Sequence, residues 1–227
     1  MRSVLFAIIV GLVGAGILIW LGTWQVQRLA WKESILAEID ARIAAPPQPL
    51  PARPDPDRDA FAPVEVAGTV LPGELHVLVS RKNVGAGYRI IAPLLTGQGR
   101  RVLIDRGFVR AAEKDAPRAL GPVTLRGNLH WPQEVDSYTP APDLSGNIWF
   151  ARDVAQLAEA LDTAPVLIVA ASETDPGVTP MPVDTAAIPN DHLQYAITWF
   201  SLAFIWTAMT AYFLWRARRA RKPDHVR

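Results

Sequence analysis

The sequence predicts a membrane protein in which two transmembrane α-helices flank an extracytoplasmic α+β domain dominated by strands. Three observations predict this fold class. An apolar run long enough to cross a bilayer lies near each end, the middle holds short strand-like segments separated by turns, and basic residues crowd behind the second run. A length of 227 residues suits one folded domain together with these membrane segments.

The first transmembrane helix is predicted over residues 4–24. No charged side chain occurs from Val4 to Leu21, and about 20 apolar residues are enough to span a bilayer as a helix. The run is longer than the apolar part of a cleaved signal peptide and no A-x-A site closes it, so we interpret it as a retained helix. Apolar residues at helical spacing predict a helical extension over residues 31–45.

The middle of the chain, residues 25–191, is predicted to form the folded domain. Its Pro-rich stretches at 46–59 and 175–189 are expected to be extended linkers. Alternating apolar residues bounded by Gly- or Pro-containing turns predict strands at 63–71, 74–80, 88–95, 101–109, 123–131 and 165–171, with a helix at 153–161. Short strands at this spacing are typical of an antiparallel sheet or a small barrel.

The second transmembrane helix is predicted over residues 192–215, because no charged side chain occurs from Leu193 to Trp215. The tail that follows, residues 216–227, is basic and begins with Arg216, Arg218, Arg219, Arg221 and Lys222. The positive-inside rule therefore places both termini in the cytoplasm. The middle domain is then expected in the periplasm, with the helices in the bacterial inner membrane.

Composition excludes several classes of function. A net charge of +1 argues against a nucleic-acid partner, and the absence of cysteine excludes disulfides, thiolate zinc sites and iron–sulfur clusters. The sequence contains no G-x-G-x-x-G, Walker, H-E-x-x-H or G-x-S-x-G motif. We therefore expect that the protein is not an enzyme.

The candidate site lies where the two helices meet the outer surface of the membrane. On one face of the second helix, at helical spacing, lie His192, Ala196, Trp199, Ala203, Trp206 and Thr210. The facing side of the first helix carries small or apolar residues, Gly11, Ala15, Leu18 and Gly22, which permit close approach. A histidine at this depth is costly unless it has a partner, and a neutral imidazole can bind a metal. Packing explains Trp206, whereas Trp199 fits either packing or contact with a ligand.

The middle domain offers weaker candidates. Asp105 and Arg106 interrupt a strand-like run, and we expect either a structural ion pair at a sheet edge or a contact for an acidic ligand group. His76 and His130 lie in strand patterns and are interpreted as surface or core residues rather than ligands.

Four segments resemble the surfeit-locus family, which includes the Surf and Shy proteins of cytochrome oxidase assembly. The end of the first helix, Leu21–Lys32, and the start of the second, Asn190–Phe200, are similar to the two membrane motifs of that family. Segments 87–94 and 102–109 are similar to its internal strand motifs, although the family often has Asn and Trp where this chain has Asp105 and Phe108. The resemblance covers the chain from end to end.

This resemblance implies an assembly factor that binds haem a and promotes its insertion into the catalytic subunit of a haem-copper terminal oxidase. It implies His192 as the axial ligand of the haem iron, with Trp199 close to the porphyrin. Trp24 and Ala196 would complete the walls, and Arg28 or Lys32 would pair with the propionates. The expected partners are the oxidase subunit, the membrane and an enzyme of haem a synthesis. A cofactor-free scaffold that stabilises an oxidase assembly intermediate is the alternative.

Overall fold

The computed structural model describes residues 2–186 and 188–219, and the chain divides into two compact units. One comprises Met1–Glu38 with Ala186–Arg227, and the other comprises Ile39–Thr185. Of the basic residues expected behind the second span, Arg216, Arg218 and Arg219 end a helix, whereas Arg221 and Lys222 lie outside the described residues.

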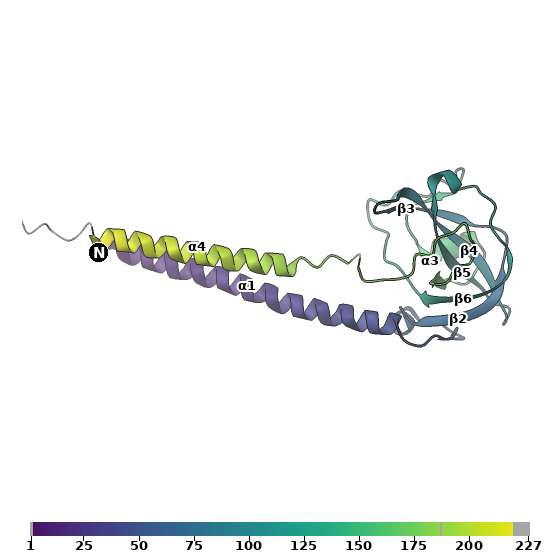
Figure 1. The fold of residues 1–227 in the computed structure, drawn as a ribbon, viewed down its shortest axis with the longest axis horizontal. Coiled ribbons are helices and arrows are strands. Elements are labelled where there is room, and N and C mark those ends of the chain that lie inside the picture. The colour runs from purple at the N-terminus through teal and green to yellow at the C-terminus, as the bar shows by residue number, and fades with distance from the viewer. Residues whose placement is uncertain (1, 187, 220–227) are drawn as a thin grey trace, which may run out of the picture. The chain divides into compact units, whose positions relative to one another are not determined.

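The first unit is a pair of helices that lie side by side (Figure 1). Helix α1 runs from Arg2 to Ile43 without a break, so it joins the two helical segments predicted at this end and stops two residues before the predicted end of the second. Helix α4 runs from His192 to Arg219. Both helices are long and apolar enough to cross a membrane, which confirms the two predicted spans as candidates by length and composition.

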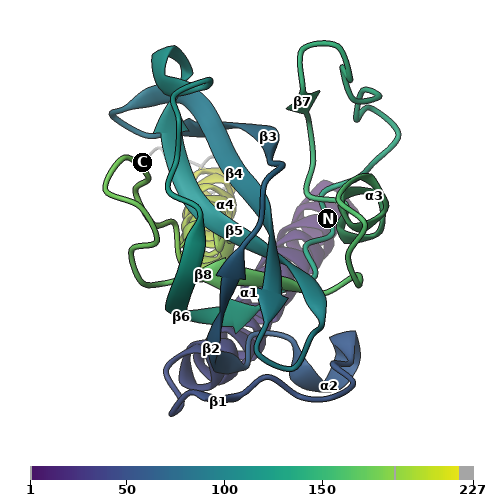
Figure 2. The ribbon, with the colours of Figure 1, turned by 90° about the vertical axis from the view of Figure 1, so that its right-hand side faces the viewer.

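The second unit is built on a five-stranded barrel (Figure 2). Its strands are paired in the order β2 (Pro63–Val70), β6 (Gly121–Leu129), β8 (Leu167–Ala170), β5 (Arg101–Arg110) and β4 (Gly85–Thr96), and β4 returns to β2. All of these pairs are antiparallel except β5 with β8, which is parallel. The predicted small barrel is therefore present, in a mixed form.

Shorter elements extend this barrel. Strand β3 (Leu75–Arg81) pairs with β4, β7 (Ile148–Trp149) pairs with β3, and η1 (Ala111–Glu113) follows β5. The stretch 46–59, expected to be an unstructured linker, contains β1 (Gln48–Pro49), which pairs with β2, and the helical turn α2 (Pro56–Asp59). The side chain of Asp55 caps this turn by accepting from the N–H groups of Asp57 and Arg58, each at 3.0 Å, and Pro56 suits its first position.

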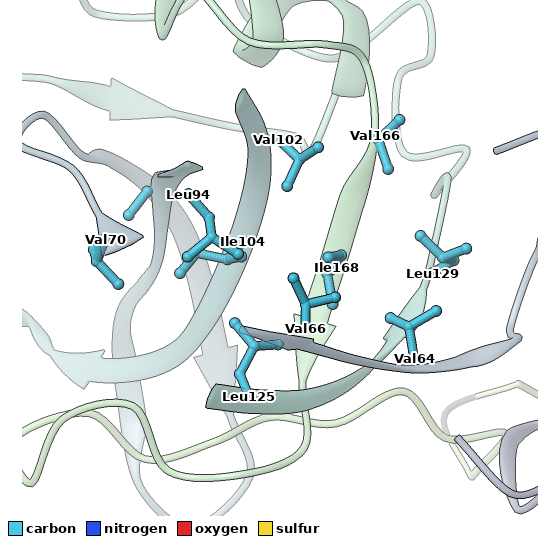
Figure 3. Close-up of a cluster of buried hydrophobic side chains, with 11 residues drawn as sticks. Val64, Val66, Val70, Leu94, Val102, Ile104, Leu125, Leu129, Val166 and Ile168 are labelled. Carbon is cyan, nitrogen blue, oxygen red and sulfur yellow. The ribbon is translucent and has the colours of Figure 1, made fainter. Parts of the chain in front are cut away.

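Branched aliphatic side chains fill the barrel (Figure 3). Along each strand every second residue points inward, as the two-residue period of a strand requires. The interior cluster comprises Val64, Val66, Val70, Ala92, Leu94, Val102, Ile104, Leu125, Leu129, Val166 and Ile168. The interior of the barrel is therefore part of the hydrophobic core.

The outward residues of β4, β5 and β8 are covered by helix α3 (Val154–Ala160) and by Trp149. Leu103 and Leu167 are fully buried beneath Leu157 of α3. The helix begins where the Asp153 side chain accepts from the N–H groups of Ala155 and Gln156, at 3.0 and 3.1 Å. This second cluster makes the outer face of the barrel part of the core.

The second stretch expected to be a linker, 175–189, is partly fixed to the barrel. Thr179 and Phe108 exchange two backbone hydrogen bonds of 2.7 and 2.9 Å, and Val178 is buried against Ile90 and Val109. This close contact requires glycine at position 107, where φ is +121° and a Cβ would lie 2.2 Å from the Thr179 carbonyl oxygen.

Candidate functional site

The helix pair packs through small residues, as the sequence predicts. A Cβ at Gly11 would lie 2.3 Å from Thr210, and one at Gly22 would lie 2.8 Å from the ring of Phe200. Ala196 and Ala203 of α4 are buried in the same contact. Helices in lipid often associate through such close contacts. Lipid tails are as apolar as the side chains, so the hydrophobic effect does not drive the helices together and van der Waals packing does.

His192 is the first residue of α4, and its ring faces α1. The N–H of Tyr195 donates to the C=O of Asp191, and Asp is a residue type favoured at the start of a helix. The Nδ1 atom of His192 lies 2.8 Å from Oε1 of Gln25, in a hydrogen bond that joins residues 167 positions apart. Within residues 2–186 and 188–219, the Nε2 atom has no hydrogen-bond partner. Gln25 thus holds Nδ1, and no described residue occupies Nε2.

Ala196 and Trp199 lie one and two turns below His192 on the same face. Ala196 is only 3% exposed, and Trp199 is partly buried. Farther along, Nε1 of Trp206 donates to the Gly11 carbonyl oxygen at 3.1 Å. Trp206 therefore contacts α1 directly, in agreement with a packing role.

Trp24 and Arg28 lie on a flank of α1 beside this contact. They are about 100° and 60° around the helix from Gln25, on the same side of it. Trp24 is 47% exposed, and the Arg28 guanidinium lies 3.8 Å from the ring centroid of Trp31. Lys32, the other candidate for pairing with an anion, donates to the carbonyl oxygen of Pro189. The structure thus joins His192 to Gln25, with Ala196 and Trp199 on the same face of α4 as His192 and with Trp24 and Arg28 on a flank of α1.

Two apolar hollows follow the groove between the helices. One, of about 360 Å³, is lined by Gly14, Ile17, Leu18, Leu202, Ile205, Trp206 and Met209. The other, of about 470 Å³, is lined by Phe6, Ala7, Val10, Gly11, Trp206, Met209, Thr210 and Phe213. They offer apolar walls on the membrane-spanning side of Trp199.

Gln25 is a site residue to which the sequence analysis assigned no role, although it lies at the end of the predicted first span, which faces His192. The signal was present, because Gly22 is on the face predicted to pack and Gln25 follows it by three residues. A polar side chain on such a face needs a partner, and the structure supplies one in His192.

Asp105 and Arg106 do not form the ion pair at a sheet edge that was one expectation. They lie in β5, between β4 and β8, and adjacent strand residues point to opposite faces. Fully buried Asp105 pairs with Arg89 and, at 3.4 Å, with Arg152, whereas Arg106 lies 3.6 Å from Asp175. Both residues are therefore structural charges inside the protein, each with its own partners.

The two histidines of the barrel unit differ in burial, and His130 is only partly buried. His76 is buried, and its Nε2 lies 2.9 Å from Oε1 of Glu74. Burial lowers the pKa of His130 from 6.5 to about 4, and the charge of Arg152 acts in the same direction. In the part of the chain that the structure describes, no three His, Asp or Glu side chains come together as a metal site.

Comparison with known proteins identifies relatives along most of the chain. Residues 12–204, which include Gln25, His192 and Trp199, match the SURF1 family. A SURF1-like protein of Monosiga brevicollis is 32% identical over 210 residues, which cover 83% of this chain and 80% of the relative. Surfeit locus protein 1 of Rattus norvegicus is 29% identical over 229 residues, covering 91% and 73%. A SURF1-like protein of Rickettsia felis is 29% identical over 204 residues, covering 82% and 87%.

Proposed function

The chain belongs to the SURF1 family, and we propose that it is a membrane-bound assembly factor for haem-copper terminal oxidases that binds haem a and promotes its insertion into the catalytic subunit. The observation that carries this proposal is the hydrogen bonding and burial of His192. A partly buried imidazole stands at the end of a candidate membrane span with Nε2 free of hydrogen bonds among the described residues. A neutral imidazole nitrogen of this kind is an axial ligand of haem iron.

The surrounding residues fit a haem. When bound, haem a would supply an iron that accepts an axial imidazole. Trp199, with Ala196 between it and His192, and Trp24 on the flank of α1 would line the ring, and the hollows beyond them are apolar. Arg28 is exposed and would pair with a propionate, because a guanidinium recognises carboxylates well. A single protein ligand suits a carrier that must release its cargo.

The orientation supports a site on the outer surface. Arg216, Arg218 and Arg219 end α4, at the opposite end of the helix from His192, and favour the cytoplasmic side. The barrel unit would then lie in the periplasm of a bacterium, where it could contact the oxidase subunit. Loading by an enzyme of haem a synthesis would take place at the same membrane.

The test is the optical spectrum of the full chain purified in detergent from cells that also make the haem a biosynthetic enzymes. We expect haem a in the wild type and in Gln194→Ala, an exposed polar residue in the same helical turn, and its loss in His192→Ala. Wild-type protein without haem, or equal haem in His192→Ala, would refute the proposal. If His192→Gln binds no haem but still supports oxidase assembly, the chain is a cofactor-free scaffold.

A further inference from the structure

Gln25 is a buried amide in a helix contact that consists mainly of small and apolar side chains. It is 9% exposed, whereas Gln27, two residues later on the same helix, is exposed. Burying an amide is costly unless it forms a hydrogen bond. The partner of its Oε1 atom is Nδ1 of His192, at 2.8 Å.

The chemistry of this bond decides which nitrogen of His192 carries the proton. An amide oxygen only accepts hydrogen bonds, so Nδ1 must be the donor. A neutral imidazole has one ring proton, and Nε2 therefore keeps its lone pair. We propose that Gln25 is a positioning residue that fixes His192 in the Nδ1–H tautomer and so reserves Nε2 for ligation. The identity of the ligand as haem rests on the proposed function, whereas the tautomer does not.

The same contact also sets the direction of the ring. Gln25 lies within α1 and His192 in the first turn of α4, so the bond joins side chains on two helices that pack closely. A second hydrogen bond to a ligating histidine orients the ring and raises its basicity, and losing one typically weakens metal binding by about 10- to 100-fold. We expect a loss of that size when Gln25 can no longer accept.

The first experiment uses the haem-free full chain in lipid bilayers, with ¹⁵N-labelled histidine, at about pH 8, where an ordinary histidine is neutral. Nitrogen NMR distinguishes a protonated from an unprotonated ring nitrogen, and the His192 signals are assigned by their loss in His192→Ala. We expect a single tautomer, with the proton on Nδ1, in the wild type. Gln25→Glu, which keeps an acceptor, and Gln27→Leu, the matched control, should preserve it.

Gln25→Leu should give a mixture of the two tautomers. A wild-type ring protonated on Nε2 would overturn the proposal, because Gln25 would then donate through its amide NH₂. An unchanged single tautomer in Gln25→Leu would also overturn it.

The second experiment titrates the same purified variants with ferric haem a. We expect about 10- to 100-fold weaker binding to Gln25→Leu and unchanged binding to Gln27→Leu. Gln25→Glu should bind, with a more negative reduction potential, because a carboxylate partner makes the imidazole a stronger electron donor. Equal affinity in Gln25→Leu and wild type would refute the positioning role. If no variant binds haem while the tautomer changes as expected, the proposed function fails and the tautomer assignment stands.

Discussion

Removing the carboxylate of Asp105 should destabilise the barrel unit far more than removing an exposed carboxylate that also pairs with an arginine. Asp105 is 0% exposed and accepts from Arg89, from Arg152 and from the N–H of Gly107. Asp105→Ala leaves two largely buried guanidinium groups without this partner. Breaking a buried pair from one side costs about 3–5 kcal/mol, a large part of the 5–15 kcal/mol that holds a typical domain.

The matched control is Asp162→Ala. The Asp162 side chain is 91% exposed and accepts from Arg101 at 2.6 Å, so its ion pair faces water. Such a pair contributes about 0.2–1 kcal/mol. Asp105→Asn provides an intermediate case, because its amide oxygen can still accept from Gly107 while the charge is lost, and it serves if Asp105→Ala does not fold.

The assay is urea unfolding of the full chain in detergent, followed by the change in tryptophan emission, to which Trp131 and Trp149 contribute from the barrel unit. We expect the free energy of unfolding to fall in the order wild type, Asp162→Ala, Asp105→Asn, Asp105→Ala. Equal losses for Asp105→Ala and Asp162→Ala would show that burial of the pair does not set its importance, and the reasoning would be wrong.

Three further outcomes test the helix contact and the barrel. Gly22→Leu should push the helices apart at a cost of about 1–3 kcal/mol, and the distance between spin labels on α1 and α4 should increase. Gly16→Leu, where a Cβ meets nothing within 4 Å, should leave this distance unchanged. The same distance in both variants would contradict the prediction. Trp206→Phe removes the hydrogen bond to Gly11 and should lower the free energy of unfolding by about 1 kcal/mol. An unchanged midpoint of thermal unfolding would contradict this prediction. Because the pKa of His130 is lowered, the free energy of unfolding should fall by up to about 3 kcal/mol as the pH drops from about 6.5 to 4, where only the unfolded state binds the proton. This fall should be absent in His130→Gln. The same pH profile in the wild type and in His130→Gln would refute the prediction.

The strands of the barrel could be predicted because their signal is local. Inward residues such as Val102 and Ile104 alternate with residues that face α3 or the buried charges, and this two-residue period is written in the sequence. The partners of a strand are not local. The parallel pairing of β5 with β8 depends on the path of the chain after β6, and the alternation of apolar residues along a strand does not predict that path.

The predictions for the charged pair in β5 and for the first Pro-rich segment were wrong for identifiable reasons. Adjacent Asp105 and Arg106 suggested a pair, although the alternation of a strand separates neighbouring side chains and gives each its own partner. Pro-rich segments suggested structureless linkers, yet Asp55 before Pro56 is also a signal for the start of a helix. Composition alone was therefore not a sufficient guide to the structure of residues 55–59.

The helix register explains why the site at His192 needs residues from both ends of the chain. One turn of a helix advances about 5.4 Å, so a slip of α4 by one turn would place His192 opposite Leu21 or Leu29 instead of Gln25. Neither leucine has an acceptor. The register is held where Gly11 and Gly22 meet Thr210 and Phe200 without a Cβ. The glycines, which carry no chemistry, therefore bring the Gln25 amide to the His192 imidazole with which it forms a hydrogen bond.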